Sequence, residues 1–241
     1  MKKMYFSVFT SLLLSTSCTD NSSDDMTDNR QDSPTHVSVN GHEFVNLGLP
    51  SGLKWATCNV GAHSPEEPGD YFAWGEVTPK SNYADFNYKW GVEYEFKKYA
   101  MTKYTEGSKT TLDAEDDAAT YNWGNDCRMP SREEYQELYN NCSCEWTTMN
   151  GRHGYLLTGK NGASIFFPAT GYYMSEKRYL YGVGGSYWSR SLYISENNPN
   201  QNPRYYSVSA YTWGFYSDRD FDNCNNSMGR DTGRSVRAVC R

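Results

Sequence analysis

The sequence predicts an α+β fold in which two helices are followed by a series of short strands. Aromatic residues make up 16% of the 241 residues, whereas all hydrophobic residues together make up only 37%. Disordered chains are poor in aromatic residues, so this composition predicts a folded chain in which tyrosine and tryptophan supply much of the buried apolar area. The two helix candidates are neighbours in the sequence and most strand candidates follow them, an order that is typical of the α+β class.

The two helix candidates lie in the middle of the chain. Residues 112–121 begin with several acidic side chains, which are favourable in the first turn of a helix. Residues 132–140 are better marked, because Ser131 can act as the N-cap and Glu134 follows three residues later, the spacing of a capping box.

Strand candidates are short and separated by turn residues. Residues 37–45 contain two alternating runs around Asn40-Gly41, a dipeptide typical of a tight hairpin. Residues 79–112 show no clear period and are expected to form a long surface excursion. The other strand candidates are residues 53–60, 155–158, 164–168, 187–193, 204–211 and 235–240, with residues 70–76 as an aromatic strand or buried loop.

The N-terminus has the organisation of an export signal. Lys2 and Lys3 precede an apolar run, residues 5–14, that is too short to span a membrane. Small residues then lead to Cys18, as in a bacterial lipobox, in which the cysteine is lipidated and becomes the first residue of the mature chain. Ser15 stands where the lipobox usually has leucine, so an ordinary cleaved signal peptide is the alternative.

An acidic, polar stretch follows Cys18 and resembles the tract that sends Bacteroides-type lipoproteins to the cell exterior. We therefore expect a lipoprotein signal peptide at residues 1–17, a disordered acidic tether at 18–36 and a single domain at 37–241. The expected location is the outer membrane, facing the cell surface, with the membrane bound through the lipid at Cys18. A net charge of −6 without a block of lysine and arginine disfavours nucleic acid as a partner.

Cysteine usage favours disulfides. Of the seven cysteines, six are left if Cys18 carries the lipid, and an even number in an exported protein is typical of disulfide bonding. The spacing of Cys142-Ser143-Cys144 does not match a CxxC redox or zinc pair. The connectivity is open among Cys58, Cys127, Cys142, Cys144, Cys224 and Cys240.

Six short motifs follow one another from about residue 44 to the end of the chain. In sequence and order they resemble the Fibrobacter succinogenes major paralogous domain. That family usually has tryptophan where this chain has Cys127, a difference that allows an additional bridge there. The motifs are residues 48–61, 69–76, 128–131, 164–169, 187–189 and 233–239.

A more distant resemblance concerns residues 118–134, which include Trp123-Gly124 and the segment 128–131. They are similar to the segment that joins two helices in formylglycine-generating-enzyme-type domains, which belong to the C-type-lectin-like superfamily. The resemblance implies a loop-rich C-type-lectin-like domain with two helices and a twisted antiparallel sheet.

No catalytic residues are assigned. One branch of that superfamily holds copper with a cysteine pair, but the surroundings of Cys224 and Cys240 do not match it. Another branch holds iron with three histidines, whereas the four histidines here are scattered. The motifs of serine hydrolases, P-loop proteins and zinc proteases are absent from the sequence. A glycan-active enzyme would need two suitably spaced carboxylates, which sequence alone does not identify.

Two acidic clusters are weak candidates for a structural calcium site. An EF-hand starting at Asp218 is excluded, because Asn223 and Gly229 occupy the positions of its glycine and its bidentate glutamate. Helix capping for the first cluster and a solvated turn for the second are the alternatives. The candidates are Asp113, Asp116 and Asp117, beside Glu115, and Asp218, Asp220 and Asp222.

Aromatic residues are concentrated between residues 187 and 216, mixed with arginine, serine and asparagine in a way typical of binding surfaces. Strand alternation predicts that Tyr205 and Tyr211 face outward, whereas Tyr206, Val208 and Ala210 face the core. Trp188 is expected to be buried. The ligand-binding candidates are Tyr205, Tyr211, Trp213, Arg190, Tyr193, Arg204 and Tyr216.

These features together predict a surface lipoprotein that binds an extracellular glycan or protein through an aromatic-rich face and catalyses no reaction. A structural cell-envelope interaction subunit is the first alternative, and a glycan-active enzyme is the second.

Overall fold

The computed structural model describes residues 35–95, 98–105, 107–194, 208–217 and 226–241. Ser33–Arg241 form one compact unit. The expected signal peptide, Cys18 and nearly all of the expected tether lie outside the described residues, and the first strand begins at His36. No helix in the described ranges combines the length and the apolar character needed to cross a membrane.

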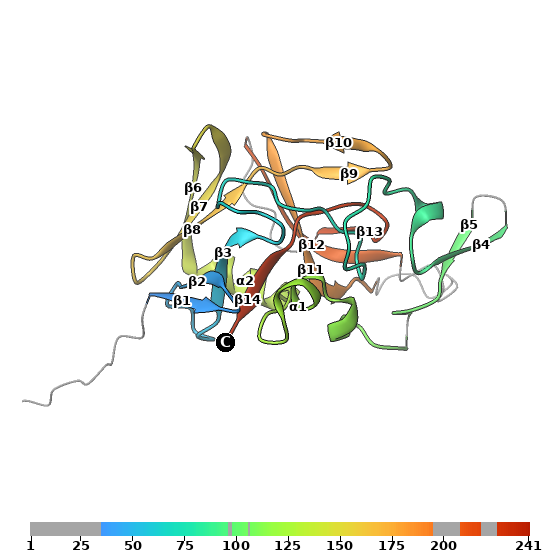
Figure 1. Cartoon of the computed structure of the whole chain (residues 1–241), viewed down its shortest axis with the longest axis horizontal. Coiled ribbons are helices and arrows are strands. Elements are labelled where there is room, and N and C mark those ends of the chain that lie inside the picture. Colours follow the sequence, from blue (N-terminus) through green and yellow to red (C-terminus); the bar gives the residue numbers. More distant parts are fainter. Residues whose placement is uncertain (1–34, 96–97, 106, 195–207, 218–225) are drawn as a thin grey trace, which may run out of the picture. The chain divides into compact units, whose positions relative to one another are not determined.

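The α+β prediction is confirmed, because two α-helices accompany antiparallel sheets (Figure 1). The N-terminal and C-terminal strands share one sheet, in which β14 pairs with β3. The order of this sheet is β1 (His36–Val39), β2 (His42–Asn46), β3 (Lys54–Asn59) and β14 (Arg237–Cys240).

Two three-stranded sheets and two hairpins complete the strands. The first sheet contains β6 (Cys142–Met149), β7 (Arg152–Gly159) and β8 (Ser164–Pro168). The second contains β11 (Gly184–Leu192), β12 (Ser209–Tyr216) and β13 (Asn226–Gly229). The hairpins are β4 (Gly91–Glu95) with β5 (Lys98–Met101), and β9 (Tyr172–Met174) with β10 (Lys177–Tyr179).

The β1–β2 hairpin forms where the sequence predicts it. Asn40 and Gly41 connect the strands and have φ angles of 51° and 81°. Two successive left-handed residues match the right-handed twist of the strands, which explains the preference for Asn-Gly at this turn.

The two helices differ in how well the sequence marks them. Helix α2 (Arg132–Asn141) starts as predicted, since the hydroxyl of Ser131 accepts from the backbone N–H of Glu134 and the Glu134 carboxylate accepts from that of Ser131. The prediction of a helix from residue 112 is wrong. A 3-10 turn, η2 (Ala114–Asp116), is followed by Asp117, whose carboxylate caps a separate helix, α1 (Ala118–Trp123).

The predicted surface excursion at residues 79–112 is wrong in part. It contains a 3-10 turn, η1 (Asp85–Asn87), and hairpin β4–β5. Three tyrosines from it, Tyr83, Tyr88 and Tyr104, are buried. Before it, the sequence predicts an aromatic strand or buried loop at residues 70–76, and residues 71–74 are buried there.

Strands β11 and β12 are buried on both faces, because alternate residues enter two different core clusters. Tyr187 and Trp213 belong to core cluster 1, whereas Trp188 and Ala210 belong to core cluster 2. Core cluster 1 also includes Trp55, Tyr135, Leu138, Phe167, Phe215 and Val239. Core cluster 2 also includes Phe44, Phe72, Trp74, Ala118, Cys127, Val236 and Cys240.

Three arginines near the C-terminus are buried in the interior. Arg237 donates to the carbonyls of Ala56 and Phe166 and to Oδ1 of Asn59, and its guanidinium lies 4.3 Å from the centre of the Phe167 ring. Arg230 and Arg234 likewise lie over aromatic rings. A planar guanidinium can stack on a ring while its edges donate hydrogen bonds, so arginine is suited to an aromatic core.

Candidate functional site

The predicted aromatic face on β12 is wrong for Trp213. This side chain has no exposed surface and stacks on Tyr135 with ring centroids 5.3 Å apart. Alternation does put Tyr211 and Trp213 on the same side of the strand, but helix α2 covers that side. Val208 is also contrary to expectation, since it is exposed, whereas Ala210 and Trp188 are buried as predicted.

The remaining candidates of this set do not form one open face. Tyr211 is half-buried between the ring of Tyr193, at 5.2 Å, and the guanidinium of Arg132, at 4.5 Å. Arg190 donates to the carbonyl of Leu112 and is partly buried. Tyr205 and Arg204 lie outside the described residues, as does Tyr206, which is predicted to face the core.

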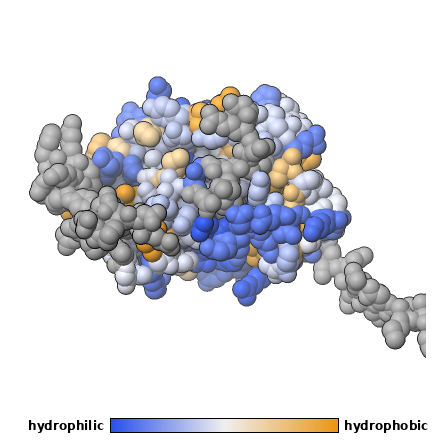
Figure 2. Space-filling model, turned by 180° about the vertical axis from the view of Figure 1, so that it is seen from behind, coloured by the Kyte–Doolittle hydropathy of each residue, from blue (hydrophilic) through white to orange (hydrophobic). Residues whose placement is uncertain are grey.

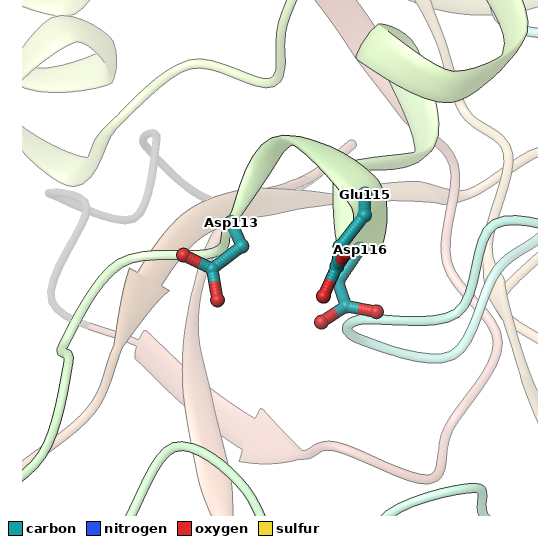
Figure 3. Close-up of side chains that lie close together, drawn as sticks. All are labelled: Asp113, Glu115 and Asp116. Atoms are coloured by element: carbon teal, nitrogen blue, oxygen red, sulfur yellow. The ribbon is translucent and has the colours of Figure 1, made fainter.

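Of the acidic candidates, Asp113 and Asp116 converge with Glu115 at the η2 turn (Figure 3). The ammonium group of Lys103 lies 2.6 Å from Asp116, 3.1 Å from Glu115 and 3.4 Å from Asp113. A protein ammonium group therefore already occupies the position where these carboxylates could hold a cation. Asp218, Asp220 and Asp222 lie outside the described residues.

Asp116 is the buried member of this cluster. Burial acts to raise the pKa of its carboxyl, but hydrogen bonds from Lys103, Tyr104 and Lys89 outweigh burial and hold the pKa below its usual value. Asp117 has a different role, since its carboxylate accepts from the N–H groups of Ala119, Thr120 and Met129. The helix-capping alternative is thus the one that the contacts of Asp117 favour.

The described cysteines are free thiols in this structure, and Cys224 lies outside the described residues. Burial raises the pKa of Cys127 and of Cys144 to about 11 and that of Cys142 to about 12. A thiol acts as a nucleophile only when it is ionised, so these three cysteines are poorly suited to nucleophilic catalysis near neutral pH.

Hairpin β9–β10 presents tyrosines at the surface. Its register pairs Tyr172 with Tyr179 and Met174 with Lys177, so these four side chains share one face. The rings of Tyr172 and Tyr179 are stacked at 5.6 Å. In Figure 1 the hairpin forms an orange ribbon separate from the β11–β12–β13 sheet.

Several large exposed apolar side chains of the described part lie in or beside this hairpin. Met174, Leu180 and Val183 have 47%, 37% and 47% of their surface exposed. Phe86, Tyr121 and Val92, with 69%, 61% and 51% of their surface exposed, lie elsewhere. On the side seen in Figure 2, apolar colour occurs in small separate patches. We use the name hairpin face for the side chains of Tyr172, Met174, Tyr179 and Leu180.

A glycine-lined pocket opens beside the hairpin face. Tyr172 and Leu180 line it from the hairpin, and Tyr216, the one predicted ligand-binding residue at this place, lines it from β12. Backbone rather than side chains forms much of the wall, which contains Gly171, Gly184, Gly185 and Gly214.

Arg234 also lines this pocket. It is 1% exposed, donates through Nη1 to the hydroxyl of Ser186, and lies 4.6 Å from the centre of the Tyr172 ring. Its buried Nε has no hydrogen-bond partner among the described residues. An unsatisfied buried donor of this kind is costly, so an acceptor that reached the Nε would stabilise this arginine.

Leu180 has an unusual backbone conformation, with φ of 57°. The left-handed region is disfavoured for a branched apolar side chain, and glycine or asparagine is preferred there. Leu180 is nevertheless exposed at the pocket rim. Strain of this kind at an exposed apolar residue is more common at binding sites than elsewhere.

A second, polar groove of about 450 Å³ lies between β2, β3 and the end of α1. His42 stacks on Trp123 there, with ring centroids 3.8 Å apart, and Glu43, Thr57 and His63 are further lining residues. Burial lowers the pKa of His42. Trp123 is only 7% exposed, so this groove offers little of the aromatic surface on which a ligand could stack.

The sequence did not identify the hairpin face, although one signal was present. Residues 172–181 contain Tyr172, Tyr173, Tyr179 and Tyr181, a dense aromatic stretch. Strands of three residues are too short to show alternation, so the stretch did not stand out as a hairpin.

Comparisons of the chain with protein-family models, with curated proteins and with solved structures find no match.

Proposed function

We propose that this protein is a non-catalytic surface lipoprotein whose C-type-lectin-like domain captures an extracellular glycan or protein through the hairpin face. The export signal and the lipobox-like residues before Cys18 support the location, and the resemblance of residues 44–241 to the major paralogous domain supports the domain type. The proposed function is the one predicted from the sequence, but the proposed binding surface is hairpin β9–β10 rather than strand β12.

The observation that carries the proposal is the exposed, left-handed Leu180 at the rim of the glycine-lined pocket. Asparagine or glycine would relieve the backbone strain and remove an apolar side chain from water contact. Folding alone therefore does not favour leucine at this position, whereas contact with a ligand would.

The surrounding groups suit a ligand with both apolar and polar faces. The stacked rings of Tyr172 and Tyr179 offer flat amphipathic area at small entropic cost. Arg234 and Ser186 supply polar groups at the pocket, and glycines allow close approach of a ligand to the backbone. The pocket itself has a volume of only about 20 Å³, so it takes one small group of the ligand while the rings contact the rest.

Filling the pocket tests the proposal. A Cβ atom added at Gly214 would be 3.5 Å from the nearest heavy atom, the carbonyl oxygen of Gly185, so Gly214→Ala narrows the pocket without a clash. The matched control is Gly91→Ala, which also meets only ordinary contacts and lies in β4, away from the pocket lining.

Arrays of glycans and of extracellular proteins, probed with the mature chain, should identify a ligand whose capture falls at least about tenfold in Gly214→Ala and is unchanged in Gly91→Ala. Equal capture by both variants would exclude this pocket. Absence of capture, together with an oligomer in which the hairpin face is protected from labelling, would favour a structural envelope subunit instead.

The membrane anchor has its own test. In Cys18→Ala the protein should leave the membrane fraction or accumulate as an unprocessed precursor, as judged by fractionation and by the mass of the N-terminal peptide. Normal processing and membrane partitioning of this variant would contradict lipidation at Cys18.

A further inference from the structure

Cys127 and Cys240 face each other across a pair of antiparallel segments. Arg128 and Val239 exchange both backbone hydrogen bonds, with N···O distances of 3.1 and 2.9 Å. In an antiparallel ladder the residue pair next to such a doubly bonded pair is a non-hydrogen-bonded pair. One step along each strand from Arg128 and Val239 leads to Cys127 and Cys240.

The position has the geometry that a cross-strand disulfide requires. Cα atoms of a non-hydrogen-bonded pair are about 4.5 Å apart, within the range of roughly 4.4–6.8 Å that disulfides span. Side chains of directly opposite residues point to the same side of the ladder. Cys127 and Cys240 both enter core cluster 2 and are 0% and 3% exposed.

The other described cysteines lack such a partner. Cys142 and Cys144 are two residues apart on β6, pack against core cluster 1, and lie opposite Gly159 and Leu157 on β7. Cys58, on β3, is half-buried at the polar groove.

We propose that Cys127 and Cys240 form a disulfide in the exported protein. A disulfide-bearing oxidant, either a protein disulfide or oxidised glutathione, supplies the oxidising equivalents. The thiolate of one cysteine attacks the oxidant to give a mixed disulfide and release one thiolate. The second cysteine then displaces the other half, so that the protein loses two electrons and two protons and the oxidant becomes two thiols.

The burial of both thiols determines when this exchange is fast. Burial raises the pKa of Cys127 and the pKa of Cys240, so little thiolate is present once core cluster 2 has closed. The bridge therefore forms during folding, before β14 docks, and the folded reduced protein is oxidised slowly.

The bridge would join the last strand of the chain to the segment before α2. The ring that it closes contains helix α2, hairpin β9–β10 and all three buried arginines. A covalent link between β14 and the segment before α2 stabilises the part of the fold that positions the hairpin face. The proposal of the bridge does not depend on whether that face binds a ligand.

Thiol mapping of the exported full-length chain tests the proposal. Free thiols are alkylated with N-ethylmaleimide under denaturing, non-reducing conditions, and the protein is digested and analysed by mass spectrometry. We expect one disulfide-linked peptide pair that contains Cys127 and Cys240. Alkylation of both cysteines, or their linkage to other cysteines, would overturn the proposal.

Matched variants make the assignment specific. Cys240→Ala should leave Cys127 open to alkylation, and Cys142→Ala should leave the Cys127–Cys240 peptide unchanged. Reduction of the wild type should lower Tm by roughly 5–15 °C, whereas Cys240→Ala should show little further change on reduction. An equal Tm with and without reductant in the wild type would also contradict the bridge.

The rate of bridge formation during refolding tests whether the bridge forms before β14 docks. Denatured, reduced protein refolded with oxidised and reduced glutathione should form the bridge at least about tenfold faster than folded, reduced protein given the same mixture. Equal rates would contradict formation of the bridge before β14 docks.

Discussion

Strand β12 and hairpin β9–β10 are both rich in aromatic residues, but β12 buries Trp213 and Phe215 completely and leaves only Tyr211 and Tyr216 half-buried, whereas no ring of the hairpin is fully buried. Trp213 and Phe215 of β12 have no exposed surface, because both belong to core cluster 1, and Ala210 on the other side of the strand belongs to core cluster 2. In the hairpin, Tyr172 and Tyr179 are half-buried and Met174 beside them is exposed.

The difference shows what alternation can predict in a chain poor in aliphatic residues. Alternation assigns residues to the two faces of a strand, but it does not say whether either face meets water. Where aromatic residues replace aliphatic ones in the core, a tyrosine-rich strand has the composition of a binding surface and the packing of an interior. Whether a second layer of structure covers the strand decides whether its tyrosines form a surface or part of the interior.

The largest expected effect distinguishes the two regions by stability. Trp213→Ala should lower the free energy of unfolding by about 3–5 kcal/mol, because it leaves a cavity between Tyr135 and Phe167. Tyr179→Ala in the hairpin should cost less than about 1 kcal/mol. Urea denaturation of both variants measures the difference, and similar losses would show that the hairpin ring is a core residue.

Replacing arginines extends the comparison to polar groups. Arg237→Met should cost about 2–4 kcal/mol, because the carbonyls of Ala56 and Phe166 then lose their buried donors. Arg178→Met is the control, because Arg178 is exposed and its guanidinium lies over ring surface, 3.6 Å from the centre of the Tyr181 ring; it should change the free energy of unfolding by less than about 1 kcal/mol. If Arg237→Met hardly changes the free energy of unfolding, the guanidinium contributes little beyond its stacked apolar area.

The acidic cluster should make stability depend on pH. Because the pKa of folded Asp116 lies below its unfolded value, its contribution is present above about pH 4 and is lost as pH falls through the folded pKa. Asp116→Asn should therefore cost about 1–2 kcal/mol near pH 7 and progressively less in acid. Glu115→Gln, at an exposed residue, is the control, and a cost of Asp116→Asn that does not change with pH would contradict the ion pairs.

The smallest effect concerns a cap that the sequence already predicts. Ser131→Ala should lower the free energy of unfolding by about 1 kcal/mol, since the N–H of Glu134 loses its acceptor. Ser143→Ala, at an exposed position of β6, should change it by less than about 0.5 kcal/mol. Thermal unfolding measures both, and equal Tm values would show that the cap adds nothing to the tertiary packing of α2.

Local signals predicted local structure well. The Asn40-Gly41 turn and the Ser131 capping box form as expected because each depends on a few neighbouring residues. The start of α1 was missed because Asp117, rather than the preceding acidic residues, supplies the cap.

Features that depend on distant segments were not predictable from the chain alone. The two lysines that contact Asp116, Lys103 and Lys89, lie 13 and 27 positions earlier, and nothing local indicates the pairing. The covering of β12 by α2 and the exposure of the hairpin face likewise depend on how layers pack. The composition therefore predicted an aromatic-rich surface, but it did not predict where in the fold aromatic side chains reach the surface.

The measurement that tests the hairpin face most directly compares Leu180→Asn with Ser175→Asn. Both replace a left-handed residue of the hairpin segment by one that tolerates this conformation, but only Leu180 lines the pocket. Each variant should be as stable as the wild type or more stable by up to about 1 kcal/mol. The account predicts that Leu180→Asn captures the array-identified ligand at least about tenfold more weakly while Ser175→Asn binds normally. Unchanged capture by a stable Leu180→Asn would contradict it.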